Sequence, residues 1–472
     1  MPQRRSHVAP SAAQSELAAA LAELRTDIDA PTEFSPEVLA EAETASAPAP
    51  DLDLRDVPFV TLDPVGSRDL DQAFHLEARG SGYQVRYAIA DVPAFVEPGG
   101  AMDAEARRRG QTLYLADGAI PLHPRVLSED RASLLAGQER PALVWTFALD
   151  DAGIVSSHRV ERALIRSREQ LDYTSAQRML DAGDPSPLAL LPRIGAARLA
   201  QEQDRGGASL NLPDDEVVQR PNGRYDIERR EPLPVEEWNA QLSLMTGMAA
   251  AEWMLDAKVG VLRTMPAPDE QAFERFRLQT EALGRPWRQG RYGDYLRELD
   301  RSDPLTLPVL EAAASLFRGA GYVVFDGQVP TDIEQAAIAA PYAHATAPLR
   351  RLVDRWALAI CLAVSNGAPA PSWARDSLSE LPSLMQQSGQ RASRLNADTV
   401  NRVEAALLHP LIGQPVEATV IELRGENRAA VQIADPAVTA TAPVPPGTRP
   451  GETVRLRLTG TDIAAGTVEF AA

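Results

Sequence analysis

Apolar and polar positions alternate through one long stretch of the chain. Between about residues 56 and 165, short runs such as PFVTLD, QAFHLE, YQVRYAIAD and ALVWTFAL alternate or are rich in β-branched residues, and turn residues separate them. This pattern predicts strands. The first fifty residues differ, because SELAAALAELRTDI and SPEVLAEAE carry apolar residues at helical spacing, with a Ser-Pro start signal in the second. TASAPAPDLD then has the composition of a linker.

Helical spacing returns in the second half of the chain. We expect helical segments between about 174 and 204, a hairpin near PNGRYDI, a helix from about Val235 to Asp256, and two helices at 348–366 and 374–408. The last sixty-odd residues, including QPVEATVIEL and ETVRLRLTG, read as the strands and turns of a small barrel of the OB type.

The expected fold class is α+β, in three parts. Residues 1–50 form a helical amino-terminal region and linker, residues 51–405 a mixed sheet and helix domain, and residues 409–472 an OB-fold barrel. At 472 residues, the chain is long enough for two to four domains and one substantial core.

Composition favours a cytoplasmic protein with no membrane association. No apolar run is long enough for a membrane span, and the start MPQRRSHVAPSAAQ lacks the apolar segment of a secretory signal. Cys361 is the sole cysteine, which excludes an internal disulfide and a multi-thiolate zinc site and suits a reducing compartment.

The net charge of −19 argues at first sight against a nucleic-acid partner, because cationic side chains drive phosphate binding. A global sum, however, is compatible with a locally positive channel. Lys258 is the only lysine, so arginine supplies nearly all the positive charge. The base composition of the genome is the simplest explanation, and the functional alternative is that guanidinium groups suit phosphate recognition.

The stretch TLDPVGSRDLDQAF places Asp63, Asp69 and Asp71 within nine positions, at the end of an expected strand and in the following loop. Carboxylates this close repel one another, and a divalent cation such as magnesium, which prefers oxygen ligands, would neutralise them. The alternative is a solvated turn in which the aspartates cap backbone amides. Asp91 ends another expected strand, so we expect Asp63 and Asp91 to face one cleft.

A second feature is YAHATAPLRRLVDRW. Pro348 stands near an expected helix start with Thr346 as a cap, which would put Arg350 and Arg351 in the first turn. The helix dipole disfavours cations there, so an anion should compensate them, either Asp354 at i+4 from Arg350 or a bound phosphate. An ordinary surface ion pair is the alternative.

Taken together with ARRRGQTLYLADGAIPLHPRVLSEDRASLL and IRSREQLDY, these stretches resemble the RNase II family of exoribonucleases. That family carries an Asp-rich loop of the form TIDxxxxxDxDDA, then IAD, ARRRG-x-x-x-YL and a TSPIRRYxD-like motif. The similarity runs from about residue 56 to 365 in the family's order. The first fifty residues cannot hold even one of the family's amino-terminal cold-shock barrels, so we expect a short form with a wider mouth that tolerates duplex RNA with a short 3′ overhang.

The resemblance implies a magnesium-dependent hydrolase, with manganese as the alternative ion, that removes nucleoside 5′-monophosphates one at a time from single-stranded RNA 3′ ends. Two carboxylate-bound metal ions would activate a water and neutralise the leaving oxygen. We expect a monomer. By the match, the metal ligands are Asp63, Asp69, Asp71 and Gln72, and the catalytic residues are Asp63, Asp69, Asp71, Arg350 and Tyr173. Tyr114 would stack on the terminal bases, and Arg107, Arg109 and Arg351 would contact RNA.

The chain also departs from the family. Gln72 stands where a fourth metal-binding aspartate is usual, and because an amide removes one negative charge we expect weaker metal affinity. A helix glutamate of the family falls near Asn239 or Ala240, and ASLNLP offers only Leu210 and Leu212 for a second base-clamping aromatic. Leu352 replaces a customary aromatic.

Other functions remain open from the sequence. VIELRGENRAAVQIADPAVTATAPV has no aromatic and few cations, so the carboxy-terminal barrel either binds RNA or serves as a docking module. The whole chain could instead be a catalytically silent relative that clamps RNA 3′ ends, or a phosphoesterase for another nucleotide.

Overall fold

The computed structural model describes residues 12–28, 30–50, 52–116, 118–183, 185–208, 214–219, 225–301, 306–425, 427–434 and 437–471. Within these ranges, no helix combines the length and the apolar character that crossing a membrane requires.

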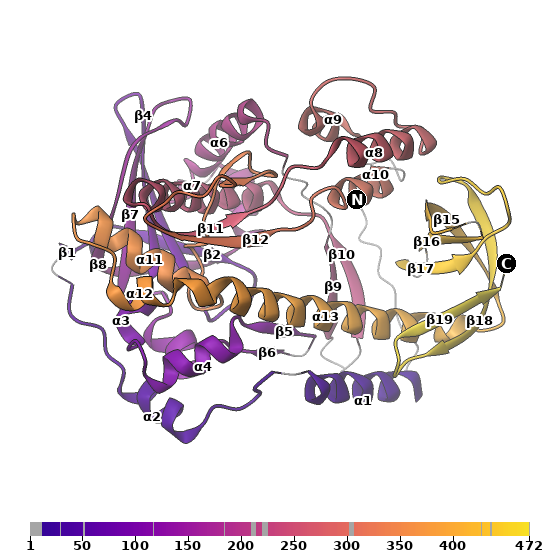
Figure 1. The fold of residues 1–472 in the computed structure, drawn as a ribbon, viewed down its shortest axis with the longest axis horizontal. Coiled ribbons are helices and arrows are strands. Elements are labelled where there is room, and N and C mark those ends of the chain that lie inside the picture. The colour runs from indigo at the N-terminus through magenta and orange to yellow at the C-terminus, as the bar shows by residue number, and fades with distance from the viewer. Residues whose placement is uncertain are drawn as a thin grey trace.

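A six-stranded mixed sheet forms the centre of the large domain (Figure 1). Its order is β1-β8-β2-β3-β4-β7, and its strands are β1 Leu52–Asp53, β2 Phe59–Asp63, β3 Gln72–Arg79, β4 Gly82–Ala90, β7 Glu139–Leu149 and β8 Val155–Asp172. The long strand β8 pairs with β7 along its first part and with β2 along its last part, so the sheet closes on itself. The strands expected between residues 56 and 165 are therefore confirmed.

Alternation along the strands separates two cores. Large side chains such as Phe74, Tyr87 and Trp145 pack with α7 (Pro234–Ala257) and α11 (Leu352–Ser365). The residues between them are mostly small, such as Ala73 and Ala88, and pack with α2 (Pro36–Thr44), α3 (Val92–Phe95) and α4 (Ala101–Arg109). The period of two in the sequence thus places one helical layer on each face of the sheet.

Smaller elements complete the large domain. They are β5 Leu113–Leu115, β6 Gly118–Ile120, η1 Leu127–Arg131, α5 Tyr173–Ala182, α6 Leu191–Arg205, β9 Asp214–Gln219, β10 Tyr225–Arg230, β11 Val259–Thr264, α8 Glu270–Ala282, α9 Tyr292–Glu298, α10 Thr306–Ala314, β12 Gly321–Asp326, β13 Glu334–Gln335 and β14 Ala340–Pro341. Strands β9 and β10 form the expected antiparallel hairpin, whose connection lies outside the described residues.

The carboxy-terminal strands form one five-stranded sheet in the order β17-β16-β15-β18-β19. Their bounds are β15 Pro415–Leu423, β16 Arg428–Ala434, β17 Ala437–Pro443, β18 Thr453–Asp462 and β19 Thr467–Ala471. The two edge strands approach each other, so the sheet is nearly closed, as expected for an OB-type barrel. Helix α13 (Leu381–Leu408) runs from the large domain to this barrel, with α1 (Ala12–Asp27) beside it (Figure 1).

Two helix expectations need correction. The helix expected from residue 348 begins only at Leu352, because the segment before it turns back and Arg351 is extended at φ −132°. The helix expected over 374–408 is divided into α12 (Ser372–Asp376), a short 3-10 turn η2 (Leu378–Glu380) and α13, where Pro382 lies in the first turn of the new helix.

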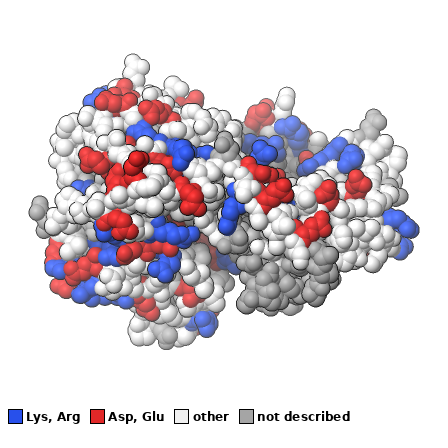
Figure 2. All heavy atoms as spheres, turned by 90° about the horizontal axis from the view of Figure 1, so that it is seen from below, with Lys and Arg blue, Asp and Glu red and all other residues white. Residues whose placement is uncertain are grey.

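Acidic and basic side chains are mixed on one face of the molecule rather than gathered into separate patches. Figure 2 shows acidic and basic side chains interspersed on the face seen from below. The described residues on that face therefore form no broad patch of one sign.

Candidate active site

The acidic cluster lies where three strands of the sheet end. Asp63 is the last residue of β2, and Asp69 and Asp71 lie in the loop that leads into β3. Because β2 and β8 run parallel, Asp63 stands opposite Asp172, the residue before Tyr173. The pairing of these strands thus brings the acidic loop and the start of α5 together.

Of the three carboxylates, that of Asp71 is buried and those of Asp63 and Asp69 are partly buried. Their charge is not fully compensated. Asp71 is only 4% exposed, and Oδ2 of Asp63 is buried without any hydrogen-bond partner. Burial raises the pKa of Asp63 to about 6; Arg350 opposes this rise and Asp69 adds to it. Burial also raises the pKa of both Asp69 and Asp71.

Arg350 faces this cluster from a distant part of the chain. Its Nε lies 3.5 Å from Oδ2 of Asp71, and its side chain is 44% exposed, so the guanidinium can also reach a ligand. The amide of Leu349 donates to Oδ1 of Asp71 at 2.7 Å. Residues 346–351, which we call the arginine segment, are therefore bound directly to the acidic loop.

Of the two anions expected to compensate Arg350, Asp354 is not its partner. Asp354 binds Arg351 instead, with 2.9 Å from both Nε and Nη2, and its Oδ1 accepts the amide of Ala347 at 2.6 Å. Asp354 therefore shapes the arginine segment, and Arg350 is left to Asp71 because the helix starts later than expected.

Both predicted tyrosines border the acidic cluster. Burial raises the pKa of Tyr173 to about 12, and Asp63 and Glu236 add to the rise. The Tyr173 hydroxyl also lies within hydrogen-bonding reach of Asn239, one of the two residues near which the family's helix glutamate was expected to fall. Tyr114, on β5, is 57% exposed, and its hydroxyl can reach Asp69. An exposed ring at the edge of the cluster suits base stacking.

Gln72 does not point a free oxygen at the cluster. Its Oε1 accepts a hydrogen bond from the Tyr87 hydroxyl at 2.6 Å, and its Nε2 donates to the carbonyl of Thr346 at 2.7 Å. The expectation that Gln72 is a metal ligand therefore lacks support from its geometry. Tyr87 was missed by sequence reasoning, since it reads as an ordinary strand residue. Thr346 was expected to cap a helix, but the helix begins only at Leu352.

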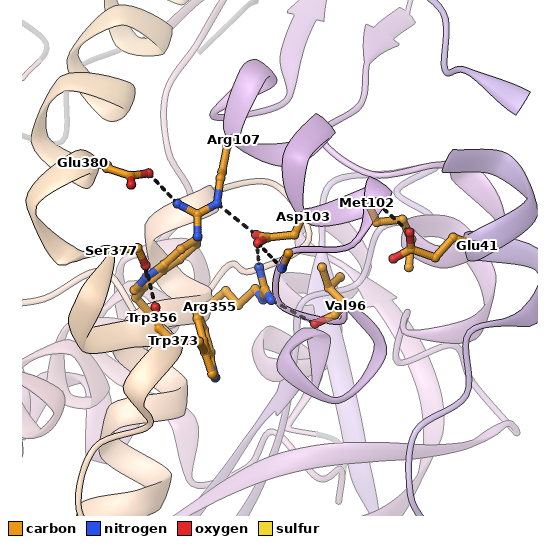
Figure 3. Close-up of polar contacts among 11 residues, drawn as sticks. Glu41, Val96, Met102, Asp103, Arg107, Arg355, Trp356, Trp373, Ser377 and Glu380 are labelled. Carbon is orange, nitrogen blue, oxygen red and sulfur yellow. Dashed lines mark hydrogen bonds and ion pairs between the residues drawn. The ribbon is translucent and has the colours of Figure 1, made fainter. Parts of the chain in front are cut away.

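Two arginines expected to contact RNA are structural. Arg109 is 3% exposed, pairs with Glu105 at 2.7 Å and covers the ring of Phe34 at 3.7 Å. Arg107 binds Asp103 and Glu380, and its guanidinium lies over the Trp356 ring (Figure 3). Their donors bind the protein itself, so the geometry does not favour either arginine as an RNA contact.

Three further expectations concern Arg351, Asp91 and the two leucines of the expected base clamp. Arg351 is mostly buried in its bidentate pair with Asp354, which leaves little of it for RNA. Asp91 is fully buried and paired with Arg162 rather than open to a cleft shared with Asp63. Leu210 and Leu212 lie outside the described residues.

The acidic cluster nevertheless fits a divalent cation. In the described part of the chain, no three acidic, histidine or cysteine side chains form a ready ligand cage. Magnesium, however, keeps several waters and is held by few carboxylates. One buried and two partly buried carboxylates with raised pKa values, one with an unpartnered oxygen, are the donor set such an ion would stabilise.

Comparison with known proteins agrees with this arrangement. Residues 52–364 match the model of the RNB domain, and residues 414–472 match the RNase II-type exonuclease C-terminal S1 domain. The chain is 28% identical over 333 residues to the probable exosome complex exonuclease RRP44 of Caenorhabditis elegans, which covers 65% of this chain and 34% of that protein. It is 28% identical over 336 residues to ribonuclease R of Escherichia coli (strain K12), a match that covers 67% of this chain and 40% of that protein.

The chain thus spans between 34% and 40% of the length of these relatives. Among solved structures, Mycoplasma genitalium RNase R in complex with ribose methylated single-stranded RNA matches with a TM-score of 0.87 at 17% identity, over 97% of this chain and 78% of that one. At this identity, the likeness shows the shared fold.

Proposed function

Because the chain belongs to the RNB-domain family, with an RNase II-type S1 domain following, we propose that it is a hydrolytic 3′-to-5′ exoribonuclease. Its substrate is the single-stranded 3′ end of RNA and its products are nucleoside 5′-monophosphates. It acts as a monomer with magnesium or manganese. The single observation that carries this proposal is that Arg350 faces a cluster of three at least partly buried carboxylates and pairs with the buried one, Asp71.

Each residue has a chemical task in this mechanism. Asp63, Asp69 and Asp71 would hold the metal, which when bound supplies an activated water and neutralises developing charge. Arg350 contacts the scissile phosphate and stabilises its charge in the transition state. Tyr173, whose pKa is about 12, keeps its proton at neutral pH and donates a hydrogen bond to the same phosphate. Tyr114 stacks on the terminal base.

A labelled oligonucleotide assay tests the proposal. Single-stranded RNA and DNA of the same sequence are incubated with the protein and magnesium, manganese or chelator. We expect stepwise shortening of RNA only, and none with chelator. RNA that is bound but never shortened would instead indicate a silent clamp, and cleavage of neither polymer would indicate another phosphoesterase.

Asp71→Asn sharpens this assay. We expect the variant to bind RNA as the wild type does but to cleave it at least about 100-fold more slowly, because an electrostatic contribution to the transition state is lost. Asp326→Asn is the matched control, since Asp326 pairs with Arg375 in an exposed ion pair of β12. Equal cleavage by Asp71→Asn and the control would contradict the proposal.

A further inference from the structure

The amide of Gln72 joins two parts of the chain that meet at the candidate active site. Its Nε2 donates to the carbonyl of Thr346, the first residue of the arginine segment, at 2.7 Å. Its Oε1 accepts from Tyr87 on β4 at 2.6 Å, and the Tyr87 side chain is fully buried. The amide is thus held at both ends.

Gln72 and its neighbour hold the same segment at two points. Asp71 accepts the amide of Leu349, and Gln72 donates to the carbonyl of Thr346. The hydroxyl of Thr346 is in turn hydrogen-bonded to that of Ser243 on α7 at 2.9 Å. Arg350 follows directly after these attachment points, so its backbone position depends on them.

A neutral amide can make both contacts of Gln72, whereas an ionised carboxylate can make only one. A carboxylate could accept from Tyr87, but it has no hydrogen to donate to the Thr346 carbonyl. It would also place a further negative charge beside three carboxylates whose pKa values are already raised. A metal ion that used Oε1 would have to compete with the Tyr87 hydroxyl.

We propose that Gln72 is a positioning residue rather than a metal ligand: it fixes the arginine segment against the acidic loop so that Arg350 faces the scissile phosphate. The inference rests on the proposed exoribonuclease function for its catalytic consequence. The structural link itself, between Gln72 and Thr346, is independent of that function.

Gln72→Met tests the proposal, because methionine keeps the side-chain length and removes both hydrogen bonds. We expect single-turnover RNA cleavage to fall by about 10- to 100-fold through misplacement of Arg350. The affinity of the RNA-free protein for Mn²⁺, measured by calorimetry, should stay within about threefold, since no ligand is lost. Gln201→Met is the matched control: Gln201 lies on α6, and the substitution removes an amide that donates to the carbonyl of Ala152.

Gln72→Asp separates the two readings further. If Gln72 were a ligand, the added charge would tighten Mn²⁺ binding and speed cleavage. If it is a positioning residue, cleavage slows as in Gln72→Met, because a shorter carboxylate cannot donate to Thr346. Mn²⁺ affinity that weakens about tenfold in Gln72→Met, or cleavage that improves in Gln72→Asp, would overturn the proposal.

Hydrogen exchange tests the contact between Gln72 and Thr346 independently of any enzymatic activity. In Gln72→Met, we expect amide exchange in residues 346–351 to accelerate at least about tenfold in the RNA-free protein, while Gln201→Met leaves it unchanged. Unchanged exchange in Gln72→Met would overturn the proposal even if the enzyme cleaves RNA. Conversely, a wild-type protein that fails to cleave RNA refutes the proposed function, and the exchange result still decides whether Gln72 holds the segment.

Discussion

The chemistry of Asp63 depends on its burial more than on its residue type. The side chain ends a buried strand, and one of its carboxylate oxygens has no hydrogen-bond partner. Burial raises its pKa to about 6, so the metal-free protein carries a carboxylate that is costly to ionise. A bound cation would remove this cost.

This shift predicts a pH-dependent stability of the metal-free protein. The pKa of Asp63 is raised above its ordinary value of 3.8 to about 6 in the folded protein. Its protonated form therefore stabilises the folded state fully below about pH 4, and this stabilisation is lost as the pH rises through about 6. Asp63→Asn should therefore have the higher melting temperature at pH 7.5 in chelator, with the difference shrinking toward pH 4. Melting curves across this range check it, and a gap that grows toward low pH would contradict the assignment.

At the residue scale, the arginines of α4 show that a sequence motif does not settle what a side chain binds. The run of three arginines in α4 matches a family motif, and its charge alone is compatible with RNA contact. In the structure, Arg109 forms an ion pair with Glu105, and Arg107 forms ion pairs with Asp103 and Glu380. Asp103 and Glu105 stand four residues before their arginines, so the i,i+4 spacing in the local sequence could have indicated these two pairs. The contact with Glu380 and the burial of Arg109 depend on the tertiary structure.

At the scale of elements, a buried charge network joins α4 to α11. Asp103 accepts hydrogen bonds from Arg355 at 2.5 Å and from the amide of Gly99 at 2.8 Å (Figure 3). Burial alone would raise the pKa of Asp103, but Arg355 and these hydrogen bonds outweigh it and lower the pKa. The carboxylate thus stays charged inside the protein and holds the two helices together.

Removing one partner of this network should be strongly destabilising. We expect Asp103→Ala to lower the free energy of unfolding by about 3–5 kcal/mol, because Arg355 would remain as a buried, uncompensated charge. Asp326→Ala breaks an ion pair that is about half exposed and should cost under about 1 kcal/mol. Denaturant unfolding of both variants checks this, and equal losses would show that burial does not set the energy.

Element boundaries were predictable only in part. The strands and the long helix α7 could be read from their apolar residues, although α7 buries consecutive positions such as Ala249, Ala250 and Ala251 rather than one face. The start of α11 could not, because Pro348 and Thr346 form a plausible local start signal. Contacts from Asp71 and Gln72, which lie far away in the sequence, hold the segment in another conformation.

At the scale of the whole molecule, α13 connects the large domain to the carboxy-terminal barrel. One apolar cluster gathers Leu17 of α1, Tyr225 of β10, Val403 of α13 and Ile463 after β18. These residues come from the amino-terminal region, the large domain and the barrel. The three parts expected from the sequence therefore share a common buried contact.

Leu17 tests this contact. Its side chain is fully buried, so we expect Leu17→Ala to lower the free energy of unfolding by about 2–5 kcal/mol through the cavity left behind. Leu278→Ala, at a largely exposed position of α8, should change it by no more than about 0.5 kcal/mol. If thermal or denaturant unfolding shows the two variants to be equally stable, α1 does not pack on α13 in solution.

The sequence by itself determined the order of the motifs along the chain, the acidic loop and the carboxy-terminal barrel, because these depend on periodicity and on residue types within short stretches. The two border tyrosines were found through the family resemblance. Only the tertiary structure decided that Asp71 faces Arg350, that Gln72 bonds to Thr346, and that Arg109 is buried. The physical reason is that burial and pairing arise between side chains hundreds of residues apart, and they set the charge and orientation that chemistry requires.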